Sequence, residues 1–124
     1  MKPGVELIAD ERRRQVEVEH FDAAHDDQWT RMELMKAAAL YHNQARGQHW
    51  SKPGKPPKTW PWDKSWWKPK TPLLDLIRAG ALYLAESERC TRAKEHQSAR
   101  VMFLCSERIA QEIDKLPAAE QSHE

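Results

Sequence analysis

Tryptophan and lysine side chains gather in one short segment of the chain, Gly47–Thr71. The segment contains five of the six tryptophans and six lysines. Indole rings can stack on the bases of single-stranded nucleic acid while lysines bind the phosphates, and tryptophan is also strongly enriched at protein-binding hot spots. Because its five prolines exclude a regular helix or strand, the rings must be ordered by packing, either on this protein or on a partner. The sequence leaves both alternatives open.

Charged side chains outside this segment could complete a binding surface with it. Arg12, Arg13 and Arg14 are consecutive on a predicted helix, so they point in different directions. We expect one of them to face inward and pair with Asp26 or Asp27. A ligand or partner is then predicted to bind where this arginine, the aspartates and the tryptophan-rich segment converge. The candidate residues are Arg12, Arg13, Asp26, Asp27, Trp60, Trp62, Asp63, Lys64, Trp66, Trp67 and Lys68.

The tryptophan loop, as we call residues 47–71, is expected to fold back on the helices as a lid. Trp60, Trp62 and at least one of Trp66 and Trp67 should then pack against them. Trp50, with lysine, proline and glycine close after it, is expected to be the most exposed ring.

A histidine and several carboxylates could bind a hard cation near the N-terminus. His25, Asp26 and Asp27 are consecutive, and Glu6 and Asp10 are four residues apart; such groups are ligands for Mg²⁺ or Mn²⁺. We favour a structural explanation, because the paired aspartates lie just ahead of a predicted helix, where anions are stabilised, and the other acids belong to a solvated face. No metal ion or cofactor is predicted. If a metal is bound, we expect Glu6, Asp10 and Asp26 to hold it.

Composition limits the class of protein. At 124 residues, with 31% charged and 40% hydrophobic residues, the chain is expected to be one soluble domain. A net charge of +1 gives no general attraction to nucleic acid or membranes. No apolar stretch approaches the ~20 residues of a membrane span, and no secretory signal pattern is visible. Two cysteines suit a reducing compartment, so we expect a cytoplasmic location.

No catalytic signature is visible in the sequence. A Ser-His-Asp order, a glycine-rich phosphate loop and a paired-cysteine site are all missing. We therefore expect a protein that binds rather than one that catalyses.

Helical periodicity on both sides of the tryptophan loop predicts an all-α fold of three to four helices, with the loop packed on the bundle. A first helix is expected over residues 5–19. After a polar connection over residues 20–29, a second is expected to begin at a capping box, with Thr30 as the N-cap and Glu33 reaching back, and to stop at Gly47.

The C-terminal half is predicted to be helical from Pro72, and Gly80 should let another helix or a ring approach closely. Either one helix runs over residues 72–116, or it breaks near Cys90-Thr91. An apolar stripe lies near its end and needs a surface to bury it, so we expect a homodimer, with packing on the first helix as the alternative. The stripe consists of Met102, Cys105, Ile109, Ile113 and Leu116.

These elements predict three parts of the chain. Residues 1–92 form a helical domain that includes the tryptophan loop. Residues 93–116 form a C-terminal helical extension. Residues 117–124 form a flexible tail.

Four sequence strings resemble a family of small phage and prophage proteins. They are GVELIADERRRQVEVE from Gly4, HDD from His25, WPWDKSWWKP from Trp60, and the spaced set Leu76, Ala79, Ala85 and Glu86. The resemblance covers about residues 4–92, and the family usually has a glycine and an aromatic residue where this chain has His20-Phe21. The turn there is expected to differ. The resemblance implies an origin in a mobile element and no particular activity.

A looser likeness is to the all-α nucleoside triphosphate pyrophosphohydrolases of the MazG type. That likeness implies a Mg²⁺ site built from Glu-x-x-Glu on one helix and Glu-x-x-Asp on another. Here Glu33 is followed by Lys36 and Asp75 by Arg78, so a base stands where each second acid should be.

We therefore expect a small phage-type accessory protein that acts by binding a host or defence component, either a protein or a nucleotide. One alternative is a MazG-like, metal-dependent pyrophosphohydrolase using Mg²⁺. Another is a binder of single-stranded nucleic acid through the tryptophan loop. No membrane partner is expected.

Overall fold

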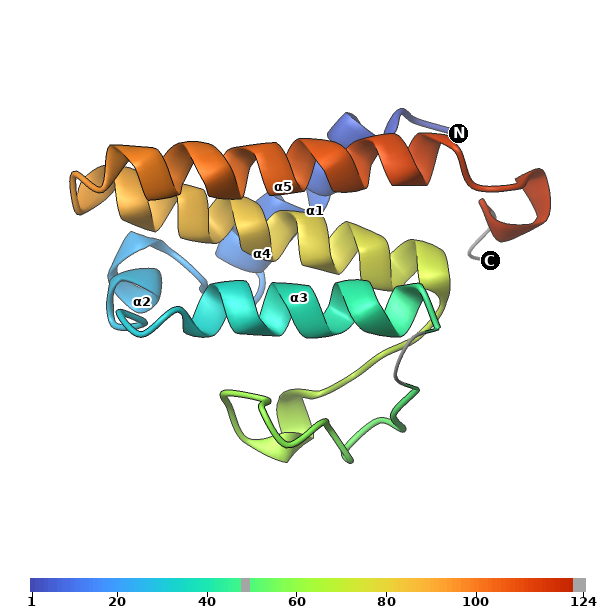
Figure 1. The fold of residues 1–124 in the computed structure, drawn as a ribbon, viewed down its shortest axis with the longest axis horizontal. Coiled ribbons are helices and arrows are strands. Elements are labelled where there is room, and N and C mark those ends of the chain that lie inside the picture. The colour runs from blue at the N-terminus through green and yellow to red at the C-terminus, as the bar shows by residue number, and fades with distance from the viewer. Residues whose placement is uncertain (48–49, 122–124) are drawn as a thin grey trace.

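The computed structural model of this protein describes residues 1–47 and 50–121, and within them every regular element is a helix. The predicted all-α fold is confirmed. Four long α-helices and one short one form the bundle, and the tryptophan loop packs on it (Figure 1). The elements are α1 (Gly4–Glu17), α2 (Ala23–Asp27), α3 (Glu33–Ala45), the 3-10 turn η1 (Lys64–Trp66), α4 (Pro72–Arg92), α5 (His96–Asp114) and the 3-10 turn η2 (Ala118–Glu120).

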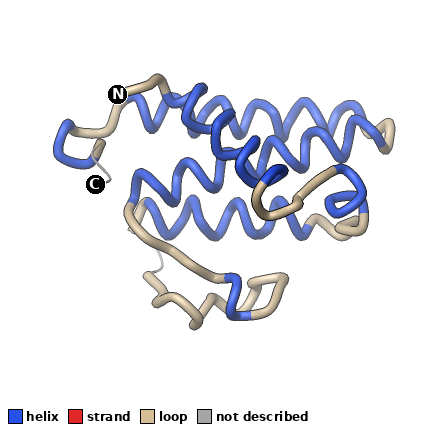
Figure 2. The backbone as a smooth tube through the Cα atoms, turned by 180° about the vertical axis from the view of Figure 1, so that it is seen from behind, coloured by secondary structure: helices blue, strands red, loops and turns tan. Residues whose placement is uncertain are grey.

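The central element is α4, which packs against α3, α5 and α1. It begins as predicted, with Pro72 in its first turn and the Thr71 hydroxyl accepting a hydrogen bond from Leu74 N at 3.2 Å. A Cβ atom on Gly80 would clash with the side chain of Ile8. The expected close approach at Gly80 is therefore confirmed. The helix that approaches is α1, which crosses in front of α4 and α5 in the view of Figure 2.

The C-terminal half consists of two helices, not one. After α4 ends at Arg92, Lys94 adopts a left-handed conformation with φ of 63°, which an α-helix cannot include. The break follows the predicted position, Cys90-Thr91, by a few residues. It lets α5 fold back along α4 (Figure 1).

The apolar stripe of α5 is buried within the chain itself. Ile109 and Ile113 are fully buried, and Met102 is 9% exposed. Cys105 and Leu116 are partly buried against the same core. Residues 93–116, predicted as an extension, thus contribute to the main core. The stripe no longer gives a reason to expect a homodimer, because α4 and α1 already cover it.

Two predictions for the region before α3 are wrong. Residues 20–29 were expected as a connection, but Ala23–Asp27 form α2, whose N-cap Asp22 accepts a hydrogen bond from His25 N at 2.9 Å. Thr30 does not cap α3. Met32 is left-handed, with φ of 65°, so the helix begins only at Glu33. Asp26 and Asp27 consequently lie inside α2 and not at the start of the next long helix.

The chain beyond α5 was predicted to be a flexible tail over residues 117–124. Residues up to Gln121 are described and include η2, and the Gln121 side chain donates a hydrogen bond to Leu116 O at 2.8 Å. The remainder of that predicted tail lies outside the described residues, as do positions 48–49 of the tryptophan loop. None of the described helices has the length and apolar character needed to span a membrane.

Candidate ligand-binding pocket

The tryptophan loop is fastened to the bundle by the hydroxyl of Tyr41 on α3. This hydroxyl accepts hydrogen bonds from Lys68 N and Arg78 Nη1, both at 3.0 Å, and lies 3.3 Å from Trp66 O, to which it donates. Arg78, on α4, also donates to Lys68 O at 3.0 Å. Two helices therefore hold the backbone of residues 66–68.

Beneath this fastening, indole rings fill the space between loop and helices. Trp67 is fully buried, and its ring centroid lies 4.6 Å from that of Tyr41. Trp60 packs edge-on against both rings, at 5.0 Å from Trp67 and 5.7 Å from Tyr41. Its indole N–H donates to Asp63 O at 3.0 Å, which closes the turn. Trp60 and Trp67 are core residues, whereas Trp50 is 69% exposed, as predicted.

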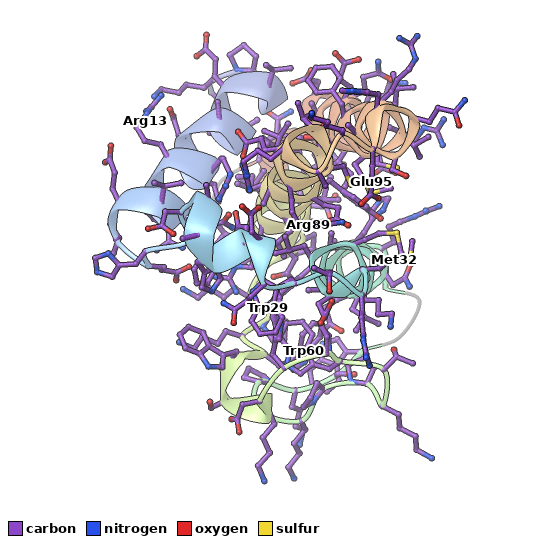
Figure 3. All side chains as sticks on the ribbon, turned by 90° about the vertical axis from the view of Figure 1, so that its left-hand side faces the viewer. Arg13, Trp29, Met32, Trp60, Arg89 and Glu95 are labelled. Carbon is purple, nitrogen blue, oxygen red and sulfur yellow. The ribbon has the colours of Figure 1, made fainter. Side chains whose placement is uncertain are left out.

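A pocket of about 410 Å³ opens beside these core rings, between the loop and the α1–α2 and α2–α3 corners. Figure 3 shows Trp29, from the α2–α3 connection, and Trp60, from the loop, in the space between these parts of the chain. The volume of the pocket falls within the ~300–1,000 Å³ typical of small-molecule sites. The lining residues are Gln15, Glu19, Phe21, His25, Trp29, Tyr41, Trp60, Pro61, Trp62, Asp63, Trp66, Lys68, Arg78 and Leu82.

Most of the pocket wall is a continuous series of aromatic rings. Phe21 stacks on His25 at 4.4 Å with an interplanar angle of 6°. Contacts continue from His25 to Trp29 at 6.0 Å, from Trp29 to Trp62 at 5.5 Å, and from Trp62 to Trp60 at 5.4 Å. Such a wall offers ring faces and edges to a flat ligand.

Trp66 stands at the mouth of the pocket. Its ring is 50% exposed, and its centroid lies 6.4 Å from that of Phe21, another ring of the wall. The ammonium group of Lys68 sits 5.3 Å from the ring centroid, which is a cation–π distance. A half-exposed indole of this kind can cover a ligand without being needed for the core.

A buried ion pair supports the α2 side of the pocket. Asp26 is fully buried in α2 and receives hydrogen bonds from Arg12 Nη2 at 2.8 Å and from His25 Nδ1 at 2.9 Å. Burial raises the pKa of the Asp26 carboxyl, and the contacts with His25 and Arg12 oppose that rise. Arg12 also binds Glu88 and Phe21 O. One arginine therefore positions both stacked rings, Phe21 and His25.

The charges around the pocket are balanced in sign. Lys68 and Arg78 are the cations of the lining, and Glu19 and Asp63 are the acids. Glu19 lies 3.2 Å from Arg14. Hydrogen bonds from the hydroxyl and backbone N–H of Ser65 hold the pKa of Asp63 below its usual value. The pocket thus carries no strong field of one sign.

The predicted candidate residues take three different positions. Trp60, Trp62, Asp63, Trp66 and Lys68 line the pocket. Arg12 and Asp26 lie behind its wall as a buried pair, which confirms the expected inward arginine, and Trp67 lies beneath the pocket in the core.

Three further candidates do not line the pocket. Arg13 is exposed and pairs with Asp10. Asp27 pairs with Arg92 at 2.8 Å. Lys64 is exposed on η1, beside the mouth. Arg13 and Asp27 are therefore not part of the pocket lining, and their membership of a binding surface stays a prediction.

Several lining residues were not among the predicted site residues. Phe21 and Trp29 could be seen as large rings in a polar segment, but nothing in the sequence marked Gln15, Tyr41 or Arg78 as members of a site. Arg78 holds the loop, because it donates to the Tyr41 hydroxyl and to Lys68 O.

The carboxylates considered for a metal site do not come together. Asp10 pairs with Lys2 and Arg13, and Asp26 is held by Arg12 and His25. Glu6 is exposed. In residues 1–47 and 50–121 no group of three or more histidine, cysteine, aspartate or glutamate side chains is arranged to hold a metal ion.

Comparisons with known protein families, with curated proteins and with solved structures find no match for this chain.

Proposed function

We propose that this chain is a small binding protein that acts without catalysis and takes the flat ring of a ligand into the aromatic pocket. The observation that carries the proposal is the ring-lined wall of a pocket of about 410 Å³, with a half-exposed tryptophan at its mouth. Stacking on aromatic side chains binds flat heterocycles with little dependence on their exact identity. The pocket therefore suits a ligand defined first by its shape.

Of the two ligand classes expected from the sequence, a nucleotide fits this site better than a host or defence protein. A protein partner would need an apolar patch that is broad and accessible. Here Trp60 and Trp67 are buried in the core. Among the rings of the loop that line the pocket, Trp66 alone is as much as half exposed. A nucleotide needs a concave site for one base, which this pocket provides. We therefore favour a phage-type accessory protein that binds a host nucleotide.

The pyrophosphohydrolase alternative gains no support from the arrangement of acids. Asp75 is buried and accepts a hydrogen bond from Lys70 N at 2.8 Å. Asp26 is engaged by Arg12 and His25. These carboxylates act in packing and loop anchoring, so a magnesium-dependent reaction would need acids that the described residues do not bring together.

A single-stranded nucleic acid is the second candidate ligand, because all six lysines of the tryptophan loop are exposed. Lys64 and Lys68 flank Trp66 at the mouth of the pocket. One base of a strand could enter while the lysines bind neighbouring phosphates. Steep weakening of binding between low and high salt would favour this candidate over a free nucleotide.

The test is a titration with the four nucleoside 5′-monophosphates and with a thymidine oligonucleotide, followed by isothermal calorimetry. Trp66→Ala is the informative variant, because a half-exposed ring can be removed without disturbing the core. Loss of stacking should weaken binding about 5- to 100-fold. Trp50→Ala removes a more exposed ring outside the pocket and should leave the affinity unchanged. Equal effects of the two variants, or no binding of any probe, would contradict the proposal.

A further inference from the structure

Unpaired polar atoms are concentrated around the aromatic pocket. Within the described residues, four buried side-chain atoms have no hydrogen-bond partner. Three of them belong to lining residues: Gln15 Oε1, Trp29 Nε1 and Trp62 Nε1. The fourth, on Trp67, lies in the core beneath. Buried polar groups in proteins are almost always hydrogen-bonded, so their concentration around one pocket calls for an explanation.

Gln15 is the most informative of the three. It is on α1, 2% exposed, and it is the lining residue whose uncharged side chain ends in an amide. A leucine or methionine could fill the same volume without burying an amide. The terminal torsion of a glutamine is soft, so its amide can present either the oxygen or the nitrogen to a neighbouring group.

The indoles of Trp29 and Trp62 supply hydrogen-bond donors beside the Gln15 acceptor. An indole N–H can only donate, and the two rings are in contact with each other at 5.5 Å. Together with the Gln15 amide oxygen, the wall thus holds one acceptor and two donors that the described residues leave unpaired. An apolar ring would satisfy none of them. A methylated ammonium would suit the ring faces but has no acceptor for the indoles.

We propose that the Gln15 amide and the indole N–H groups of Trp29 and Trp62 read the edge of the ligand, so that the pocket selects a nucleobase over an apolar ring or a methylated ammonium. This inference rests on the proposed function and specifies its ligand. The edge of a nucleobase carries N–H donors and carbonyl or ring-nitrogen acceptors on one flat ring. The polar atoms of the three side chains are buried, so the proposal requires these side chains to rotate towards the ligand when it binds.

His25 is fixed in a form that suits the same role. Its Nδ1 is engaged with Asp26 at 2.9 Å, so Nε2 is the ring atom left for a ligand. A carboxylate can only accept, so Nδ1 donates to Asp26, and in that tautomer Nε2 is an acceptor. His25 can therefore receive a hydrogen bond from an exocyclic amino group.

The test compares three kinds of probe on the wild-type protein: the four nucleoside 5′-monophosphates, 1-naphthyl phosphate and choline. Naphthyl phosphate keeps a flat ring and a phosphate but has no polar ring edge. The tightest nucleotide should bind at least about tenfold more tightly than naphthyl phosphate, which corresponds to the loss of one or two hydrogen bonds.

Gln15→Met then separates hydrogen bonding to the edge of the ligand from stacking on its faces. Methionine matches the length of glutamine but cannot form the hydrogen bond, so nucleotide affinity should fall about tenfold while naphthyl phosphate affinity stays the same. Trp62→Phe is a second variant, which keeps an aromatic ring and removes one N–H; it should weaken nucleotide binding several-fold and leave naphthyl phosphate unaffected. Thermal melting confirms that both variants are folded.

The outcomes separate this inference from the function on which it rests. Naphthyl phosphate binding as tightly as the nucleotides, or an unchanged nucleotide affinity in both folded variants, would overturn edge reading and leave ring binding intact. Tight binding of choline with no binding of nucleotides would identify a cation cage and overturn the nucleobase assignment. If no probe binds the wild-type protein, the proposed function fails as well.

Discussion

Arg12 of α1 and Asp26 of α2 form a buried ion pair, with 2.8 Å between Nη2 and Oδ2 and side-chain exposures of 10% and 0%. The pair ties together two helices that share few other contacts, and Asp26 in turn orients His25 in the pocket wall. The same arginine binds Phe21 O at 3.1 Å. The wall of the pocket therefore depends on an ion pair that the ligand itself would not touch.

Removing the arginine should expose this dependence. Arg12→Met leaves the Asp26 carboxylate buried without its main countercharge, so we expect the free energy of unfolding to fall by about 3–5 kcal/mol. Adding Asp26→Asn to that variant should restore part of the loss. Urea unfolding measures both changes. Arg13→Met, an exposed neighbour in α1, is the control and should stay within about 0.5 kcal/mol of wild type; a similar loss in the control would refute the account of Arg12.

Asp75 should make stability depend on pH. Burial raises the pKa of its carboxyl from 3.8 to about 6, against the opposing effect of the Lys70 N–H. The folded state favours the protonated carboxyl of Asp75. The stabilisation that this protonation gives the folded state is fully present below pH ~4 and is lost as the pH rises through about 6. Asp75→Asn keeps an oxygen that can accept the Lys70 N–H and should be about 3 kcal/mol more stable than wild type at pH 7.5.

The matching measurement is the difference in unfolding free energy between wild type and Asp75→Asn across pH 3.5–7.5. That difference should be small at the acidic end and grow towards neutral pH. Glu107→Gln, an exposed carboxylate on α5, serves as the control and should show no such trend. A difference that stays constant with pH would mean that Asp75 is not strained by burial.

The loop's tryptophans should divide into structural and exposed groups. Trp67 is fully buried between Tyr41 and Trp60, so Trp67→Ala should cost about 3–5 kcal/mol of unfolding free energy. Trp50→Ala should cost no more than about 0.5 kcal/mol. Denaturant titration of the two variants decides the matter. Comparable losses would show that the loop is not anchored as the structure indicates.

Tyr41 should control how firmly the loop is held. Tyr41→Phe deletes the hydroxyl that accepts from Lys68 N and Arg78, at a cost of about 1–3 kcal/mol. We expect faster tryptic cleavage after Lys58 and Lys64, which are exposed and are not followed by proline. Tyr83→Phe alters a buried tyrosine of α4 outside the pocket lining and should not accelerate cleavage there. Equal cleavage rates in Tyr41→Phe and wild type would contradict the claim that the Tyr41 hydroxyl holds the loop.

The sequence predicted the helices better than the segments between them. Periodicity and Thr71-Pro72 correctly indicated α4, because these signals are local, and Gly80 indicated a close approach to its backbone without saying which element approaches. The start of α3 was mispredicted, since the left-handed Met32 has no sequence signal and the Thr30–Glu33 capping box is a match by spacing alone. The homodimer was predicted from a stripe that α4 and α1 bury in the same chain, which depends on a turn at Lys94.

Only one part of the candidate site could be predicted from the sequence, for a similar reason. The rings of the tryptophan loop identify one wall of the pocket. The other wall comes from α1 and α2, and Gln15 and His25 reach it only through the angle at which these helices pack. No local pattern encodes that angle, so the sequence could not distinguish these lining residues from Arg13 and Asp27, which lie near them in sequence but do not line the pocket.

The central claim, that the aromatic pocket binds a nucleobase, is tested most directly by the six indole N–H signals in a ¹⁵N–¹H spectrum, assigned by single Trp→Phe variants. On titration with the tightest nucleoside monophosphate, the signals of Trp29, Trp62 and Trp66 should shift together along one binding curve. Those of Trp50, which is exposed outside the pocket, and Trp67, which is buried beneath it, should move little. Shifts confined to Trp50, or no shift at any indole at saturating nucleotide, would contradict the account.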